Sequence, residues 1–196
     1  MLDVPRPALL IVDVQKDFCE GGALAVRGGD RVVPLLNQVI RLLTPQGALI
    51  LASRDWHPAR TTHFRGRGGA WPPHCVAGTA GAAFHENLQL PAGTIWISKG
   101  QAPGEDGYSA FDGTTPEGHS LSSALADRRI ERLYVGGLAT DYCVQQTVLD
   151  ALAHGLVVTV ITDAVAAVEL APGDGARALD AMTAAGATLA TSGDLT

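Results

Sequence analysis

Short runs of consecutive apolar residues alternate along this chain with stretches in which apolar residues recur at helical spacing. The first pattern is typical of buried β-strands and the second of amphipathic helices. The apolar runs predict strands at residues 7–14, 47–52, 94–98, 132–136, 156–162 and 187–191. The helical patterns cover residues 30–43, 121–127, 141–154 and 174–185.

The order of these elements indicates the fold class. Strands that are apolar along their whole length are typical of parallel sheets covered on both faces. Helices between such strands form right-handed crossovers. We therefore expect an α/β fold, a three-layer sandwich with a mostly parallel sheet of about six strands flanked by helices. The chain shows no internal repeat and no interdomain linker, so we expect residues 1–196 to form a single domain.

Composition narrows the classes of function. The net charge of −6 and the charged fraction of 17% argue against an electrostatic nucleic-acid binder. The longest apolar runs are far too short to span a bilayer, and residues 1–6 show no secretory signal pattern. An odd count of three cysteines does not indicate a disulfide framework. We expect a cytoplasmic protein that binds neither nucleic acid nor membrane, and a homo-oligomer is compatible with the sequence.

Three long segments interrupt the alternation of strands and helices, at residues 19–29, 56–90 and 100–119. They are rich in Gly and Pro and contain aromatic residues and histidines. Long loops within a compact domain are usually functional or disordered, and the aromatic content favours function.

Cys143 follows the predicted strand at 132–136 and lies in the first turn of the predicted helix at 141–154. The positive end of a helix dipole favours a thiolate there, and free backbone N–H groups can stabilise an oxyanion. The alternative is a small buried residue that packs the helix on the sheet. The local pattern leaves both interpretations open.

Two other reactive side chains also lie at the carboxyl ends of predicted strands, where open α/β sheets bind ligands. Asp13 lies near the end of the first strand and Lys99 follows the third. A carboxylate can take the proton of a thiol, and an ammonium group stabilises both anions. Asp13 alone could cap a turn and Lys99 alone could be solvated, so the signal is their combination with Cys143.

A second group of residues has the character of metal ligands. In Asp55-Trp56-His57 the carboxylate and the imidazole point the same way if the chain is extended, and His63 and His74 follow nearby. One carboxylate with two or three imidazoles suits Zn²⁺, Fe²⁺ or Mn²⁺. The alternative is a set of surface histidines in a polar loop.

Five motifs together resemble the nicotinamidase/pyrazinamidase branch of the isochorismatase-like cysteine hydrolase family, over nearly the whole chain. They are ALLIVDVQKDFCEGGALAV, SRDWHP, WPPHCVAGTAGAAF, ISKG followed by GYSAFDG, and GGLATDYCV. The resemblance implies that Asp13, Lys99 and Cys143 form a catalytic triad. It also implies an oxyanion hole from the backbone N–H groups of Ala139 and Cys143, and a cis peptide bond between Leu138 and Ala139.

The same resemblance implies one divalent metal ion, Zn²⁺, Fe²⁺ or Mn²⁺, held by Asp55, His57 and His74. Many relatives carry a His and then a Ser where this chain has Thr61 and His63. The change resembles the subgroup with an additional His ligand, which makes His63 a candidate fourth ligand.

The activity implied is hydrolysis of nicotinamide to nicotinate and ammonia, with pyrazinamide as a close analogue, in NAD salvage. Candidate residues for the walls around the substrate ring are Phe18, Leu24, Trp71, Leu138, Ala139 and Tyr142. The alternatives are an amidase of another small carbamoyl or ureido compound, an isochorismatase, and a non-catalytic relative that binds metal or ligand. We interpret Cys19 and Cys75 as structural neighbours of the site.

Overall fold

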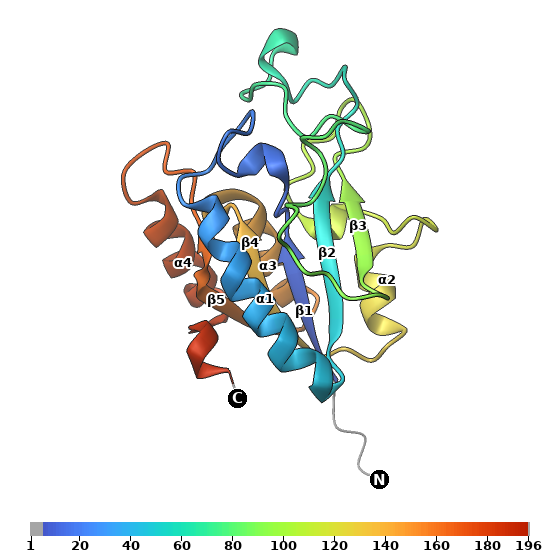
Figure 1. The fold of residues 1–196 in the computed structure, drawn as a ribbon, viewed down its shortest axis with the longest axis vertical. Coiled ribbons are helices and arrows are strands. Elements are labelled where there is room, and N and C mark those ends of the chain that lie inside the picture. The colour runs from blue at the N-terminus through green and yellow to red at the C-terminus, as the bar shows by residue number, and fades with distance from the viewer. Residues whose placement is uncertain (1–5, 196) are drawn as a thin grey trace.

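The computed structural model describes residues 6–195. Residues 1–5 and 196 lie outside the described part, and so does most of the segment in which the sequence showed no signal pattern. Six parallel strands form one sheet in the order β3-β2-β1-β4-β5-β6 (Figure 1). They are β1 (Pro7–Val12), β2 (Leu49–Asp55), β3 (Ile95–Lys99), β4 (Arg132–Leu138), β5 (Val157–Ala166) and β6 (Thr188–Ala190).

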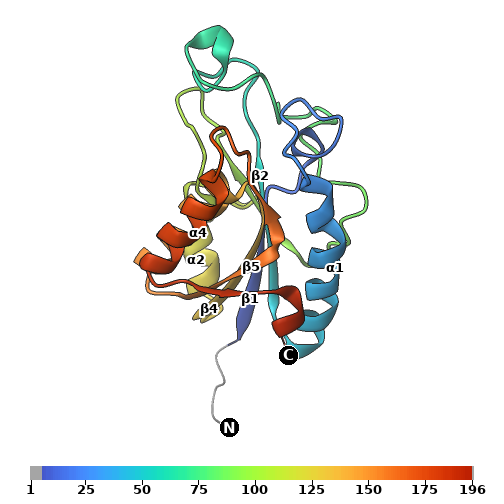
Figure 2. The ribbon, with the colours of Figure 1, turned by 90° about the vertical axis from the view of Figure 1, so that its left-hand side faces the viewer.

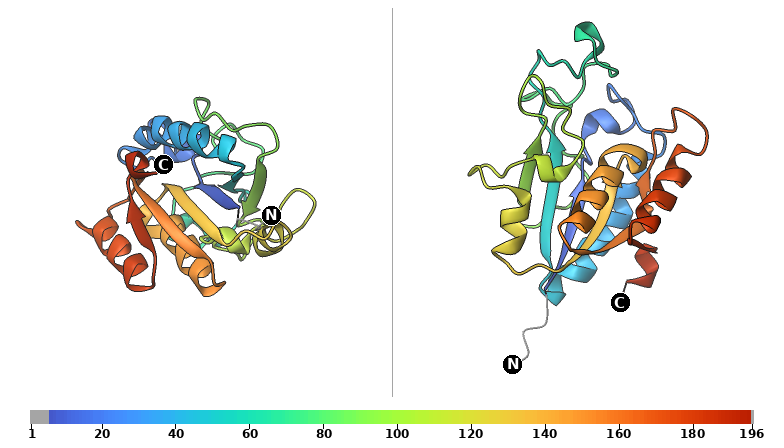
Figure 3. Two further views of the ribbon diagram at one scale, coloured as in Figure 1. Left: turned by 90° about the horizontal axis from the view of Figure 1, so that it is seen from below. Right: turned by 180° about the vertical axis from the view of Figure 1, so that it is seen from behind.

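Helices cover both faces of the sheet. One face carries α1 (Val32–Leu43), and the opposite face carries α2 (Leu121–Ala126), α3 (Gln145–Ala153) and α4 (Asp174–Ala184) (Figures 2 and 3). The predicted three-layer α/β sandwich with a six-stranded parallel sheet is therefore confirmed.

The core is divided by the sheet into two apolar clusters, and β1 contributes to both. Leu9 and Ile11 pack in the cluster that contains α1. Leu10, between them, packs in the cluster that contains α2, α3 and α4, because successive side chains of a strand alternate between faces. Leu36 of α1 is fully buried, and burial of such a side chain contributes about 1.5–3 kcal/mol.

β1 and β2 end next to candidate site residues, and the ends of these strands differ from the prediction. β1 ends at Val12 rather than at residue 14, because Asp13 takes a left-handed conformation with φ 49°. β2 continues to Asp55, because the polar residues after Ala52 still pair with β3 in register. β5 likewise extends to Ala166. Most other predicted boundaries agree to within two residues.

The predicted helix at residues 141–154 is wrong at its start. Thr140–Val144 forms a π-helical turn, in which the Val144 N–H donates to the Ala139 carbonyl five residues earlier, and α3 begins only at Gln145. Cys143 therefore lies in the π turn that connects β4 to α3. π-helical turns of this kind are frequent at functional sites, because they displace a side chain from the regular helical position.

The long loops gather at the carboxyl end of the sheet, at the top of Figure 1. The segment after β2 forms the outermost part and includes a short 3-10 turn, Arg65–Arg67. Among residues 6–195, every helix is too short or too polar to cross a bilayer.

Candidate active site

A buried lysine contacts the reactive side chains at this edge of the sheet. Lys99, the last residue of β3, is fully buried. Its Nζ lies 2.7 Å from Asp13 Oδ2 and 3.4 Å from Cys143 Sγ, and it also forms an ion pair with Asp55. The Gly107 carbonyl accepts a further hydrogen bond of 2.5 Å from Nζ. One ammonium group thus contacts two carboxylates and a thiol.

Asp13 is held by the backbone and by Ser53. Its backbone N–H donates to the Ser53 carbonyl, and the Ser53 hydroxyl donates to Asp13 Oδ1 at 2.7 Å. Next to it, Gly137 of β4 has φ 125°, and a Cβ there would lie 2.1 Å from the Val12 carbonyl oxygen. Only glycine lets β1 and β4 approach so closely, which brings Asp13 near the loop that carries Cys143.

Burial and charge together set the protonation of these groups. Burial raises the pKa of Asp13 despite the nearby Lys99 ammonium. Burial also raises the pKa of the Cys143 thiol well above its usual range, an effect that Lys99 partly offsets. Burial disfavours the Lys99 ammonium, yet Asp13 and Asp55 raise its pKa well above the usual value. Burial therefore favours the protonated thiol, and Asp13, whose carboxyl group lies within 4.8 Å of the sulfur, can accept this proton when it is ionised.

A second cluster of buried side chains lies next to Asp55. The nitrogens of His57, His63 and His74 that can bind a metal lie within 4.8 Å of one another, and all three side chains are buried. Asp55 Oδ2 lies 3.5 Å from His57 Nε2 and 3.7 Å from His74 Nε2. Burial raises the pKa of Asp55, but Lys99, His57 and His74 together outweigh this effect and keep the pKa well below its usual range. Asp55 is therefore a carboxylate shared between the lysine and the histidines.

Each of the three imidazoles has its Nδ1 against an oxygen. His57 Nδ1 lies 3.1 Å from the Gly100 carbonyl, and His74 Nδ1 lies 2.8 Å from the Pro72 carbonyl. His63 Nδ1 lies 3.1 Å from Asp106 Oδ1. Carbonyl and carboxylate oxygens only accept hydrogen bonds, so Nδ1 carries the proton and Nε2 keeps a lone pair.

This arrangement fits a divalent metal ion. His57 Nε2 is buried without a hydrogen-bond partner and faces the Asp55 carboxylate, so its lone pair lies near a negative charge. A cation between the two groups would satisfy both the lone pair and the negative charge. Three imidazoles fixed by second-sphere acceptors, with one carboxylate, form a donor set suited to Zn²⁺, Fe²⁺ or Mn²⁺.

A pocket opens between the two clusters. Its lining contains Cys143 from the first cluster, Asp55, which both clusters share, and His63 and His74 from the second. Five of the six candidate wall residues line it, namely Phe18, Leu24, Trp71, Ala139 and Tyr142. Leu138 is not in this lining: it is fully buried in the apolar cluster beneath α1. The peptide bond between Leu138 and Ala139 is cis, as the resemblance implies.

Three further lining residues, Val26, Tyr108 and Val168, are absent from the sequence-based set. Tyr108 belongs to the GYSAFDG motif, and its hydroxyl accepts a 2.9 Å hydrogen bond from Trp71 Nε1. The GYSAFDG motif could therefore have identified Tyr108 as a site residue from the sequence. Val168 lies in the loop after β5, which showed no motif.

Gln15 is a supporting residue that the sequence analysis also missed. It is fully buried, its Oε1 accepts from the Asp55 backbone N–H at 2.8 Å, and its Nε2 donates to the Asp55 carbonyl at 2.9 Å. The side chain pairs with Asp55 as a neighbouring strand would, which fixes the backbone of this residue.

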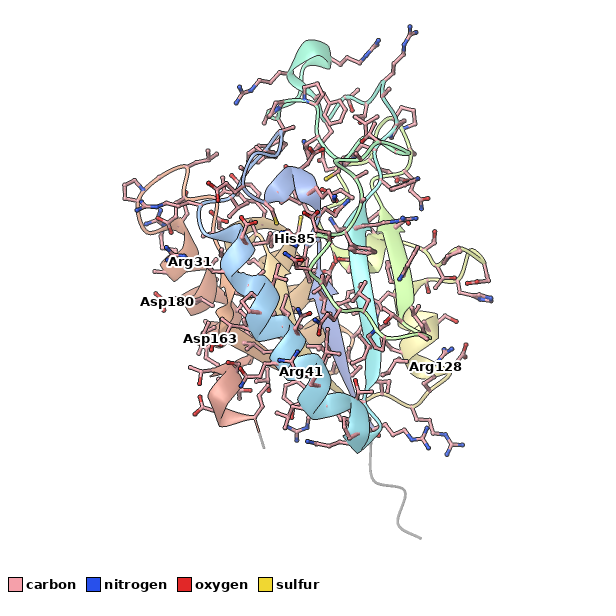
Figure 4. All side chains as sticks on the ribbon, in the orientation of Figure 1. Arg31, Arg41, His85, Arg128, Asp163 and Asp180 are labelled. Carbon is pink, nitrogen blue, oxygen red and sulfur yellow. The ribbon has the colours of Figure 1, made fainter. Side chains whose placement is uncertain are left out.

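The other two cysteines are buried and free. Burial raises the pKa of Cys19 to about 11 and that of Cys75 well above the usual range. Near Cys19, His85 lies beside the start of α1, with its Nε2 3.2 Å from Asp30 Oδ1 (Figure 4). Cys143 differs from both cysteines by its contact with Lys99 and its place in the pocket lining.

Residues 7–194 match the model of the isochorismatase domain. Nicotinamidase of Escherichia coli (strain K12) is 44% identical, over 97% of this chain and 97% of that protein. The structure of pyrazinamidase of Pyrococcus horikoshii in complex with zinc has a TM-score of 0.88 at 44% identity, covering 95% of this chain and 99% of that one. PnC1 from L. infantum in complex with nicotinate has a TM-score of 0.86 at 34% identity, covering 97% and 95%. The chain belongs to the isochorismatase family.

Proposed function

We propose that this protein is a metal-dependent cysteine amidohydrolase that converts nicotinamide to nicotinate and ammonia in NAD salvage, and that it also accepts pyrazinamide. The observation that carries the proposal is a single pocket with Cys143 in its lining and His63 and His74 in the same lining. A thiol beside a general base is the equipment of acyl transfer, and a metal site nearby suits a substrate with a ring nitrogen. The nicotinamidase and pyrazinamidase relatives support the same assignment.

In the first half of the reaction, Asp13 accepts the proton of the Cys143 thiol and the sulfur attacks the carboxamide carbon. The backbone N–H groups of Ala139 and Cys143 stabilise the oxyanion of the tetrahedral intermediate. Asp13 then gives its proton to the amide nitrogen, the carbon–nitrogen bond breaks, ammonia leaves and a thioester remains.

In the second half, Asp13 takes a proton from water, and the resulting hydroxide attacks the thioester carbon. The carbon–sulfur bond breaks, nicotinate is released and the thiol regains its proton from Asp13. Lys99 contacts both Asp13 and Cys143, so its charge stabilises the anion on whichever group holds it.

Asp55, His57, His63 and His74 would hold the metal ion. When bound, the ion would supply a Lewis acid for the pyridine nitrogen of the substrate, either directly or through water, and so would help to fix the position of the ring. Phe18, Leu24, Trp71, Tyr108 and Tyr142 line the pocket and supply apolar surface to the ring. We assign no substrate contact to Leu138.

The three free cysteines support a reducing compartment, and we propose that the enzyme works in the cytoplasm. The proposed single domain would comprise residues 1–196.

The test is ammonia release by zinc-loaded protein from nicotinamide and, in parallel, from benzamide, which has the same ring shape without the nitrogen. We expect turnover of nicotinamide, and slower turnover of benzamide by on the order of 100-fold or more. Equal turnover of the two amides would contradict the role of the ring nitrogen. No ammonia from nicotinamide, with hydrolysis of a carbamoyl or ureido amide instead, would overturn the substrate.

A further inference from the structure

The three metal-ligand histidines differ in what holds their second nitrogen. His57 and His74 donate to backbone carbonyls, which no side-chain substitution removes. His63 donates to the carboxylate of Asp106. We propose that Asp106 is a positioning residue that orients His63 toward the metal and so sets the affinity of this enzyme for its divalent cation. The proposal rests on the metal site of the proposed function.

The contact between the two side chains joins a buried group to an exposed one. The side chain of His63 is 4% exposed and that of Asp106 is 69% exposed, while their closest atoms are 3.1 Å apart. Asp106 therefore adds little to the packing of the core. Its removal takes away the acceptor of the His63 Nδ1–H, while the ring stays packed against His57 and Tyr108. The ring can then change tautomer, which puts the proton on Nε2 and removes the lone pair that would bind the metal.

The backbone of His63 is fixed independently of Asp106. The His63 N–H donates to Thr61 Oγ1, and the Thr61 hydroxyl in turn donates to the Pro103 carbonyl at 3.0 Å. The Thr62 N–H donates to the same carbonyl at 2.8 Å. These bonds hold the main chain, so the contact with Asp106 acts on the ring of His63 and not on its backbone. A substitution at Asp106 should thus perturb the metal site without unfolding the loop.

Asp106 also lies in the loop that contacts both clusters. The Gly100 carbonyl at the start of this loop accepts from His57, and the Gly107 carbonyl at its end accepts from Lys99. A Cβ at Gly107 would lie 2.5 Å from the backbone nitrogen of Gly100, so the two ends of the loop are in close contact. The position of Asp106 is consequently fixed by its neighbours, which is what a positioning residue requires.

The expected magnitude follows from the chemistry of outer-sphere partners. A carboxylate that accepts from Nδ1–H fixes the tautomer and makes Nε2 a better donor to the metal. Substitution of such partners typically lowers metal affinity by about 10- to 100-fold. The same range is expected for Asp106→Ala.

The experiment measures zinc affinity directly, by competition with a chromophoric chelator, for the wild type, Asp106→Ala, Asp106→Asn and Asp112→Asn. Asp112 is the matched control, because it is an exposed acid that lines the same surface groove as Asp106, outside the pocket that contains Cys143. We expect Asp106→Ala to weaken zinc binding by about 10- to 100-fold and Asp106→Asn, which keeps an acceptor oxygen, by less. Asp112→Asn should remain within about twofold of the wild type, since an exposed charge is screened.

Two outcomes of the affinity measurement overturn the proposal. One is zinc affinity of Asp106→Ala within about twofold of the wild type, and the other is an equal loss in Asp112→Asn, which would indicate a general effect of charge. The melting temperature of the metal-free variants separates positioning from folding, and we expect Asp106→Ala to match the wild type. A lower value in the metal-free state would assign Asp106 a structural role instead. Wild-type protein that binds zinc but does not hydrolyse nicotinamide would contradict the proposed function while leaving the role of Asp106 intact.

Discussion

The two buried clusters at the carboxyl end of the sheet are built in different ways. Asp13, Lys99 and Cys143 lie at or just after strand ends, and the lysine forms ion pairs with Asp13 and Asp55. His57, His63 and His74 all come from the long segment after β2, and His57 Nε2 faces a carboxylate without a hydrogen-bond partner. The first cluster contains a cation of the chain itself, Lys99, whereas the second would be completed by a metal ion. The difference separates a self-contained nucleophile from a site that depends on metal supply.

Asp55 is the one residue that belongs to both clusters. One of its oxygens contacts Lys99, and the other lies near His57 and His74. Its ionised state, which Lys99, His57 and His74 maintain together, serves both clusters at once. The comparison therefore predicts that the nucleophile remains assembled when the metal is removed, whereas loss of Lys99 damages both clusters.

The largest effect is expected from removal of the nucleophile. Cys143→Ala should lower nicotinamide hydrolysis by on the order of 10⁴-fold or more, because the variant can form no thioester. The matched control is Cys19→Ala, which removes another buried thiol outside the pocket lining and should keep most of the activity. Steady-state ammonia release measures both. Substantial activity in Cys143→Ala would move the nucleophile elsewhere.

Replacement of Lys99 tests the completeness of the first cluster. Lys99→Met fills a similar volume but leaves Asp13 and Asp55 buried without their shared cation, which typically destabilises a protein by about 3–5 kcal/mol. Urea unfolding of the metal-free protein measures the free energy of unfolding. The activity of the variant should also fall sharply. A variant as stable as the wild type would show that the carboxylates do not need the ammonium.

Metal removal tests the independence of the two clusters. The chelator-stripped enzyme should lose nicotinamide turnover and regain it with added Zn²⁺, Fe²⁺ or Mn²⁺, while alkylation of Cys143 by iodoacetamide should stay within a few-fold of the metal-loaded rate. The loaded enzyme should be more stable by about 4 kcal/mol at a metal concentration 1,000 times the Kd. A collapse of the Cys143 alkylation rate on stripping would show that the metal also organises the nucleophile.

The smallest effect concerns the pH dependence of the base. Burial already raises the pKa of Asp13, and the Ser53 hydroxyl lowers it by a hydrogen bond. Only ionised Asp13 accepts a proton, so kcat/KM should fall as pH drops through this raised pKa. Ser53→Ala removes the hydrogen bond and should move the acid limb of the profile to higher pH. An unchanged or lowered midpoint would assign the acid limb to another group.

The sequence alone predicted the alternation of strands and helices and hence the fold class, because apolar runs and helical periodicity are local patterns. It also predicted that Asp13, Lys99 and Cys143 meet, since parallel strands end at one edge of the sheet. The metal ligands followed in part from the Asp-x-His spacing and in part from the family resemblance. These inferences depend on chain order and need no knowledge of packing.

Only the tertiary structure decided the features that arise from contacts between distant segments. Pairing with β3 extended β2 to Asp55, although the residues after Ala52 are polar. Burial beneath α1 removed Leu138 from the pocket lining, and Val168 entered that lining from a loop without a motif. The partner of His63 is Asp106, 43 residues away in the sequence. Local patterns carry no information on such pairs, because their energy comes from neighbours that the fold alone brings together.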